Sequence, residues 1–375
     1  MSLTKKDQIN INLLRVALGI QGGDNLMPSD KDWRDFFLFC KDQAMLGIGF
    51  SAVEKIRDCP KDFMLKWYSF VVQIEKRNKH LNEVATDMCQ KIAYMGLRCC
   101  LLKGQGVAAL YPNASRRSSG DIDLWTEGSR EKIIEIVHNV HNEPEVSLHH
   151  ASVNYKDVEI EYHFTPSYLI NPIADRRLRQ YYHDNQERQF SHLIRLEGCK
   201  QDIAFPTSDF NLVFMLSHAY RHFIYEGLGM RHVIDYWMVL KAWNEAGRQK
   251  EKDVIRIISK CGMMKFLYAM MWVIGKLMVD DERITKKYCS WMLCDPNEKE
   301  GRFLLGHIMR NGNFGRGNQS RQAINDIRNP LKRYVLQKKH SLSIYKHYPS
   351  ELFWGLYHSI YYRIALKRTG DKKDR

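Results

Sequence analysis

Hydrophobic residues change their spacing twice along this chain, and this change restricts the folds that it can adopt. In the run that follows Pro60 they recur at three- and four-residue intervals, which is the spacing of one helix face. Short segments that alternate between apolar and polar residues come next, and after Pro206 the helical spacing returns. We therefore expect an α+β chain with a helical region at 1–95, an α/β core with a small mixed or antiparallel sheet at 96–206, and a helical domain at 207–375.

The same patterns predict where the elements lie. In the core, strands are expected at 98–102, 120–125, 146–155 and 158–164, and helices at 105–110 and after Ser129. Lys156 and Asp157 separate the last two of these strands and predict a tight hairpin turn. A later pair of strands, at 192–196 and 202–205, either extends the sheet or forms a flap. Further helices are expected at 207–219, 230–243, 254–261, 266–278 and 351–366, the last packed on the protein rather than lying on a membrane.

Composition limits the class of protein. Of the 375 residues, 44% are hydrophobic, which is enough to build real cores. No run of about 18 uncharged apolar residues is present, so we expect no transmembrane helix. The N-terminal segment lacks the apolar block of a signal peptide, and the nine cysteines include no CxxC pair. These features predict a cytoplasmic protein with free thiols.

The chain carries a formal net charge of +14. An excess of this size favours an anionic partner such as a nucleotide, a nucleic acid or a membrane surface. A protein with an ordinary basic surface would show the same excess, and the charge alone does not separate the two interpretations.

Two aspartates stand one residue apart in an apolar segment. On a strand, Asp121 and Asp123 would point to one face, with Ile122 and Leu124 on the other. Paired carboxylates repel each other unless a cation lies between them. The pair therefore favours a metal site, although a turn that happens to contain two acids would give the same pattern.

A second acidic strand lies about forty residues further on. In the segment 158–164, Glu159, Glu161 and His163 alternate with apolar residues and share one face. If this strand neighbours the aspartate strand, the carboxylates converge into a set of oxygen ligands suited to Mg²⁺. On its own, the segment would be read as a solvated strand face.

Basic residues lie between the strand expected at 98–102 and the aspartate strand expected at 120–125. The Lys103–Gly104 turn can bring backbone N–H groups close to an anion. Lys103, Arg116 and Arg117 could hold phosphates, with lysine as a point charge and arginine as a fork. Ordinary surface charges remain an equal alternative.

These motifs together resemble a bacterial family of uncharacterised nucleotidyltransferases with a DNA polymerase β-like nucleotidyltransferase core. The resemblance spans roughly residues 95 to 245. It rests on the residues Lys103–Gly104, Tyr111–Pro112, Arg117, Asp121, Asp123, Glu161 and His163, and in a later helical segment on His218, His222, Gly229, Arg231 and Asp235. Where the wider superfamily has Gly-Ser or Gly-Gly in the first turn, this chain has Gly104–Gln105, whose amide can bond to a phosphate but is larger.

The resemblance implies transfer of a nucleoside monophosphate from an NTP, with ATP the favoured donor, to an unidentified hydroxyl or amine. It implies that Mg²⁺ or Mn²⁺ is held by Asp121, Asp123 and Glu161, with Glu159 competing for the third position. The phosphates would be bound by Lys103, Gly104, Gln105, Arg117 and Arg231. Roles for His163, His218, His222 and Asp235 stay open; the spacing of His218 and His222 permits a metal, but structural histidines are favoured.

Two other functions remain as alternatives. A nucleotide- or nucleic-acid-binding module could keep this fold without turnover, which the Gln105 departure and the basic charge favour. A metal-dependent glycosyltransferase also uses a D-x-D motif, but about 95 helical residues and one strand precede the motif here, which is unusual for that fold. No recognisable RNA-binding module is present, so a nucleic-acid acceptor is not favoured.

Overall fold

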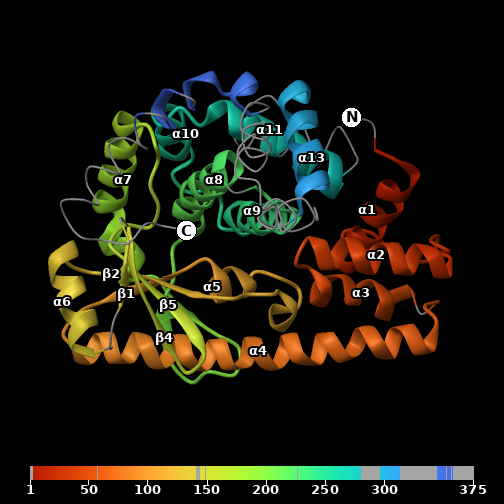
Figure 1. The fold of residues 1–375 in the computed structure, drawn as a ribbon, viewed down its shortest axis with the longest axis horizontal. Coiled ribbons are helices and arrows are strands. Elements are labelled where there is room, and N and C mark those ends of the chain that lie inside the picture. The colour runs from red at the N-terminus through yellow and green to blue at the C-terminus, as the bar shows by residue number, and fades with distance from the viewer. Residues whose placement is uncertain are drawn as a thin grey trace, which may run out of the picture.

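The computed structural model describes residues 3–56, 58–140, 144–147, 149–225, 227–279, 296–312, 344–351, 353–355 and 357. Its fold is α+β, as the change in hydrophobic spacing predicts. In Figure 1 one long helix, α4, runs along the base, with α1–α3 stacked over one half of it and the sheet over the other half. The C-terminal helices lie on the far side of the sheet from α4.

The N-terminal helices begin and end where capping residues occur. Ser29 starts α2 with a reciprocal capping box: its side chain accepts from the Asp32 N–H, and the Asp32 carboxylate accepts from the Ser29 N–H. Pro60 precedes α4, and Gly96 follows it with a φ of 72°. The bounds are α1 (Lys5–Ala17), α2 (Asp30–Asp42), α3 (Leu46–Ile56) and α4 (Lys61–Tyr94).

The core contains a five-stranded sheet in the order β1-β2-β5-β4-β3, in which only the β2–β5 pair is parallel. Lys156 and Asp157, with φ of 50° and 60°, form the predicted tight turn between β4 and β5. The elements of this part are β1 (Cys99–Leu102), α5 (Gly104–Ala108), η1 (Ala114–Arg116), β2 (Ile122–Thr126), α6 (Arg130–Val140), β3 (Glu145–Val146), β4 (His150–Tyr155) and β5 (Val158–His163).

One expectation for this region is wrong, and one helix was not predicted. The segment 146–155 is not one strand, because it folds back into the antiparallel pair β3–β4. The Ser147 N–H donates to the His150 carbonyl at 2.9 Å, and the Ser147 hydroxyl accepts from the His150 N–H at 3.2 Å, so both groups close the turn between β3 and β4. A helix was also missed: α7 (Pro172–Phe190) begins at the cap Asn171 with proline in its first turn.

The later strand pair, β6 (Leu193–Arg195) and β7 (Asp202–Ala204), forms its own two-stranded sheet and does not extend the main one. The predicted C-terminal helices correspond to α8 (Ser208–Tyr225), α9 (Met230–Glu245), α10 (Glu251–Lys260) and α11 (Met264–Ile274), followed by the π-helical turn η2 (Gly275–Val279) and α13 (Glu298–Asn311). Most of the helix expected at 351–366 lies outside the described residues. The boundaries proposed at 95/96 and 206/207 remain predictions.

The two faces of the main sheet pack against different helices. One face, with Ile122 and Leu124, joins residues of α4 and α6 in one hydrophobic cluster. The other face joins a larger cluster with α1–α3 and α7–α11. Trp125 anchors that second face, because its ring stacks on Phe210 of α8 at 5.7 Å and meets Phe190 of α7 edge-on at 5.0 Å.

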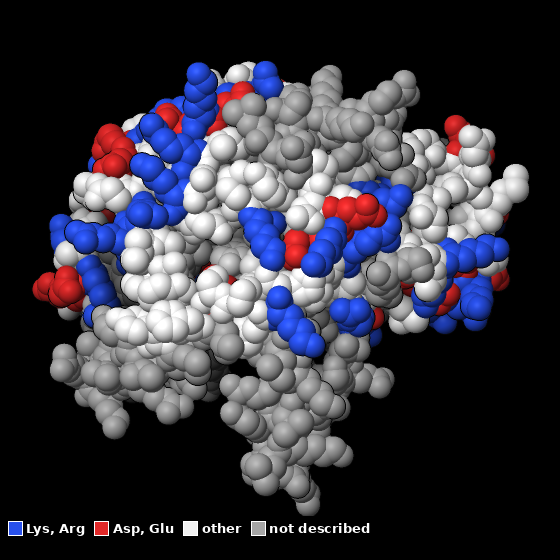
Figure 2. All heavy atoms as spheres, turned by 90° about the horizontal axis from the view of Figure 1, so that it is seen from above, with Lys and Arg blue, Asp and Glu red and all other residues white. Residues whose placement is uncertain are grey.

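Two further observations concern membrane-spanning helices and surface charge. Among the described helices, none is both long and apolar enough to cross a bilayer. Figure 2 shows the molecule from above: on the described part of this face, lysine and arginine side chains are spread out, with acidic residues between them. The excess positive charge therefore does not gather into one continuous stripe on that part of the surface.

Candidate active site

The candidate site lies on the sheet face that is turned toward the C-terminal helices. Along β2, Ile122 and Leu124 enter the cluster with α4, so Asp123 between them points to the opposite face. β5 lies parallel beside β2, and Glu161 is the direct partner of Asp123. The two acidic strands identified in the sequence are therefore neighbours.

Asp123, Glu161 and His163 form a compact cluster in which one ligand atom from each lies within 4.8 Å of the others. His163 Nε2 is 2.8 Å from Asp123 Oδ1 and 3.0 Å from Glu161 Oε2. Burial opposes a positive charge on His163, but the hydrogen bonds to both carboxylates raise the pKa of its imidazole to about 9. The same contact with His163 outweighs burial at Glu161 and lowers the pKa of that carboxyl.

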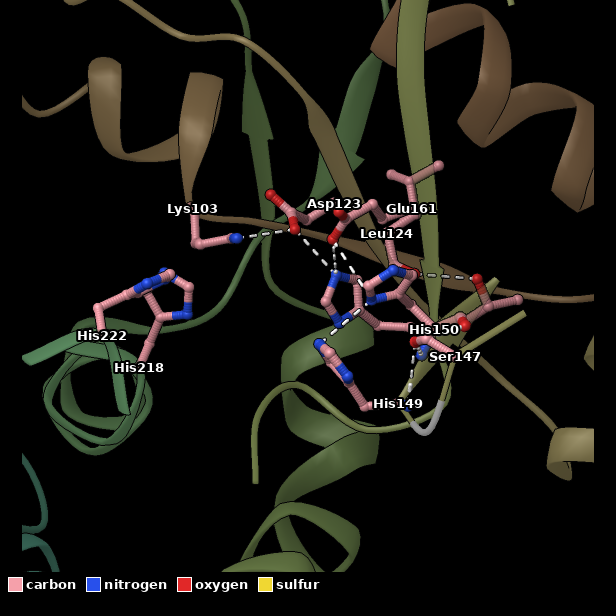
Figure 3. Close-up of polar contacts among 11 residues, drawn as sticks. Lys103, Asp123, Leu124, Ser147, His149, His150, Glu161, His218 and His222 are labelled. Carbon is pink, nitrogen blue, oxygen red and sulfur yellow. Dashed lines mark hydrogen bonds and ion pairs between the residues drawn. The ribbon is translucent and has the colours of Figure 1, made fainter. Parts of the chain in front are cut away.

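Lys103 brings a second positive charge to this cluster. Its backbone has a φ of 47°, where the chain turns from β1 into α5, and its Nζ lies 2.8 Å from Asp123 Oδ1 (Figure 3). Burial disfavours the ammonium, but the charges of Asp123, Asp121 and Glu161 raise the pKa of Lys103. Lys103 and His163 thus balance the charges of Asp123 and Glu161.

Two histidines that the sequence analysis did not single out extend the cluster. His150 Nδ1 lies 3.6 Å from Glu161 Oε2 and 3.1 Å from His149 Nε2. Burial lowers the pKa of His150 to about 4, so it is neutral at physiological pH. In the β4–β5 ladder His150 is the partner of His163, and the adjacent histidines 149 and 150 were the signal that could have shown this.

The two remaining acids of the predicted site lie further out. Asp121 precedes β2 and is not part of the compact Asp123–Glu161–His163 cluster, although its charge still acts on Lys103. Glu159 is exposed and is opposite Asn154 in the β4–β5 ladder. Burial and the charge of Glu161 raise the pKa of Glu159.

The Gly104–Gln105 turn is built differently from a simple phosphate loop. Gly104 has a φ of 41°, a conformation that favours glycine. The Gln105 side chain is 3% exposed, and its Nε2 donates to Asn82 Oδ1 at 2.7 Å and to the Asn78 carbonyl at 3.2 Å. In this conformation the Gln105 amide nitrogen fastens α5 to α4.

Arg117 and Asp235 form a buried ion pair. Arg117 Nε and Nη2 each lie 2.7 Å from an oxygen of Asp235, and the Tyr111 hydroxyl donates to the same carboxylate at 2.7 Å. Arg231 Nη1 donates to the Ser118 carbonyl at 2.8 Å. The structure therefore ties the loop before Asp121 to α9 through both arginines that the resemblance assigned to phosphates.

His218 and His222 lie on α8, on the other side of Lys103 from Asp123 (Figure 3). Their Nε2 atoms are 3.0 Å apart. His232 of α9, a residue that the sequence analysis did not select, completes a group of three buried histidines.

Comparison with known proteins assigns this chain to a family. The family model described as an uncharacterised nucleotidyltransferase matches residues 29–279. The chain belongs to this family. No curated protein matches it. Among solved structures, it is similar to an antigenic nucleotidyltransferase-like protein from Paracoccidioides brasiliensis, with 14% identity over 43% of this chain and 75% of that chain and a TM-score of 0.28.

The acids of this family member suit a divalent metal. Asp123 Oδ1 is engaged by Lys103 and His163, whereas Asp123 Oδ2 is buried and has no hydrogen-bond partner among the described residues. An unpartnered buried carboxylate oxygen next to a second carboxylate is a donor set that suits Mg²⁺, which prefers hard oxygen ligands. Asp123 and Glu161 are the residues that would hold such an ion.

Proposed function

We propose that this member of the nucleotidyltransferase family transfers a nucleoside monophosphate from an NTP to a hydroxyl or amine, with release of pyrophosphate and with Mg²⁺ as cofactor. The supporting observation is the register of β2 and β5, which sets Asp123 and Glu161 directly opposite each other. Family membership supports the reaction class. ATP is the donor to test first.

In this proposal each side chain has a definite task. Asp123 and Glu161, with Asp121 at the end of the loop, would hold Mg²⁺. The ion would supply charge neutralisation at the phosphates and would lower the pKa of the acceptor hydroxyl. Lys103 moves its ammonium from Asp123 to a phosphate oxygen of the NTP. Glu161 accepts the proton of the acceptor.

Arg117 and Arg231 act as positioning residues in this scheme. The Arg117 guanidinium already holds Asp235 with two nitrogens, and Arg231 holds the Ser118 carbonyl. Both contacts fix the loop that carries Asp121. A direct phosphate contact would require Arg117 to release a buried carboxylate, which is costly.

One competing function has a specific observation in its favour. Lys103 forms an ion pair with Asp123, and the Gln105 side chain donates a hydrogen bond to α4. The side chains on both sides of Gly104 are therefore already bonded to other parts of the protein. A module that binds a nucleotide without turnover would have this arrangement. The two proposals give different results in one experiment.

The experiment measures pyrophosphate release from each NTP with MgCl₂, together with nucleotide binding by calorimetry. We expect wild-type turnover to be lost in Asp123→Asn, because charge stabilisation of this kind contributes about 10²–10³-fold or more to rate. Asp157→Asn, in the β4–β5 turn, is the control and should keep full activity. Nucleotide binding without pyrophosphate release under any acceptor condition would support the binding module; equal activity in Asp123→Asn would disprove the site.

A further inference from the structure

Three histidines from two helices meet away from the acidic cluster. His218 and His222 are one turn apart on α8, so their side chains share one helix face. His232 lies in the first turn of α9, which is the next helix of the chain and packs against α8. We call these three residues the histidine trio.

The geometry of the histidine trio is that of a ligand set. One ring nitrogen from each residue lies within 4.8 Å of the other two, and the Nε2 atoms of His218 and His222 are 3.0 Å apart. Nitrogens bound to one tetrahedral zinc ion at 2.0–2.1 Å are about 3.3 Å from each other. The spacing of the His218 and His222 nitrogens is close to this value.

Burial keeps the trio in the form that binds metals. The three side chains are 6–7% exposed. Desolvation lowers the pKa of His218 and His232 well below the usual value, which favours the neutral form of these two rings. A neutral imidazole has the free lone pair that a metal requires.

We propose that His218, His222 and His232 bind one transition-metal ion of the Zn²⁺ class, at a site separate from Asp123 and Glu161. Three imidazoles suit zinc and its neighbours in the first transition row, whereas Mg²⁺ prefers oxygen. A bound ion would fasten α8 to α9, the helix that carries Asp235.

The charges around the histidine trio indicate which kind of fourth ligand the metal ion would have. Lys103 and Arg231 act on the trio as positive charges, and Asp235 acts on His232 as a negative one. These positive side chains repel a divalent cation that has only neutral ligands. They attract an anion that binds the cation as a further ligand. We therefore expect hydroxide or a phosphate oxygen in the fourth position.

Two existing contacts would change on metal binding: the 3.0 Å hydrogen bond between the Nε2 atoms of His218 and His222, and a bond to His232. The Gly229 N–H donates to His232 Nδ1 at 3.3 Å, which makes Nδ1 an acceptor and places the proton of the neutral ring on Nε2. Coordination through Nε2 moves that proton to Nδ1 and gives up this long hydrogen bond. The metal–nitrogen bond replaces it.

The test measures binding of Zn²⁺ itself and does not depend on nucleotidyl transfer, so its failure is distinct from failure of the proposed function. The full chain is dialysed against EDTA and titrated with ZnCl₂ in competition with a chromogenic chelator. We expect one tight site in the wild type and a loss of at least about 100-fold in affinity in His218→Asn and in His222→Asn, the upper end of the loss for removing outer-sphere partners.

Matched controls are His149→Asn, from the other histidine cluster, and His183→Asn, whose side chain is 80% exposed. Both should keep the wild-type affinity. Loss of the site in His149→Asn instead of His218→Asn, or unchanged affinity in both trio variants, would overturn the proposal.

A measurement on the wild type covers the case in which the trio variants do not fold. X-ray absorption of the zinc-loaded protein counts the imidazole ligands. Three imidazoles, retained in His149→Asn, support the trio. A shell of oxygen ligands, or loss of the imidazoles in His149→Asn, would exclude it.

Discussion

The two oxygens of the Asp123 carboxylate have different surroundings. Oδ1 contacts both Lys103 and His163, whereas Oδ2 is buried without a hydrogen-bond partner among the described residues. The carboxylate is thus neutralised from one side only. A cation that approaches Oδ2 competes with Lys103 for the same negative charge.

Lys103→Met tests this competition. In metal-free buffer the variant should lose about 3 kcal/mol of unfolding free energy, because a buried carboxylate loses one of its two cationic partners. Added MgCl₂ should restore more stability in the variant than in the wild type, since Mg²⁺ then replaces the ammonium beside Asp123. Urea unfolding with and without MgCl₂ measures both effects.

The control is Lys156→Met, which removes a surface ion pair with Asp87. It should change the unfolding free energy by less than about 1 kcal/mol, with no added response to Mg²⁺. An equal response to Mg²⁺ in Lys103→Met and in the wild type would contradict the competition.

A comparison of Glu161→Gln with Glu159→Gln identifies the third carboxylate. Glu161 is in register with Asp123 and contacts His163, whereas Glu159 is exposed and lies two residues earlier on β5. We expect Glu161→Gln to lower kcat for pyrophosphate release by about 10²-fold and Glu159→Gln to leave it within a few-fold. The opposite order would transfer the role to Glu159.

The position of a side chain could be predicted from the sequence only where its partners follow from local strand or helix spacing. Strand alternation was sufficient to put Glu161 and His163 on one face and to align Asp123 with them once β2 and β5 paired. The orientation of Gln105 was not predictable, because Asn78 and Asn82, which bind its amide, belong to a helix that precedes it in the chain. Hydrogen bonds between distant residues leave no periodic signal.

Helix α9 is joined to the loop before β2 by the buried pair Arg117–Asp235, whose side chains are 5% and 2% exposed. Burial disfavours the charge on Asp235, but Arg117 lowers the pKa of that carboxyl below its usual value. The pair therefore stays ionised over the physiological range. Its main effect is to fix one element against another.

Asp235→Asn should destabilise the protein by about 3–5 kcal/mol, because Arg117 is left as a buried charge without a carboxylate. Thermal and urea unfolding measure the loss. Asp202→Asn, which removes the exposed pair with Arg195, should cost less than about 1 kcal/mol. Equal losses in the two variants would show that burial of the Arg117–Asp235 pair adds nothing.

Elements were predictable where the apolar spacing was strong. Helices α8 and α9 have such spacing and were found, as was the hairpin of β4 and β5. Helix α7 was missed because arginine, glutamine and other polar residues cover most of it, and only its start at Asn171 and Pro172 carries a local signal. Few of its residues are buried, so the spacing that marks a core-facing helix is weak there.

The N-terminal helices and the C-terminal helices share one hydrophobic cluster, although the α/β core separates them in the sequence. Arg15 of α1 donates to the carbonyls of Leu277 at 2.7 Å and Lys276 at 3.0 Å. The helical spacing predicted each group of helices, but spacing within a helix does not show which other helix it will meet. This long-range pairing holds the C-terminal helices over the sheet face that carries Asp123.

Gln43, at the end of α2, makes long-range hydrogen bonds to two C-terminal helices. Its Oε1 accepts from the Met230 N–H at the start of α9 at 2.7 Å, and its Nε2 donates to the Ile308 carbonyl of α13 at 3.1 Å. Gln43→Ala would leave the Met230 N–H unpaired and would remove one of two donors to the Ile308 carbonyl, which also accepts from the Gly312 N–H at 3.1 Å. We therefore expect a loss of about 1–3 kcal/mol in unfolding free energy. Gln180→Ala, which breaks a bond to Asp184 within α7, should change it by less than about 0.5 kcal/mol. Urea unfolding of both variants measures the difference, and equal values would mean that α2 does not stabilise the position of α9.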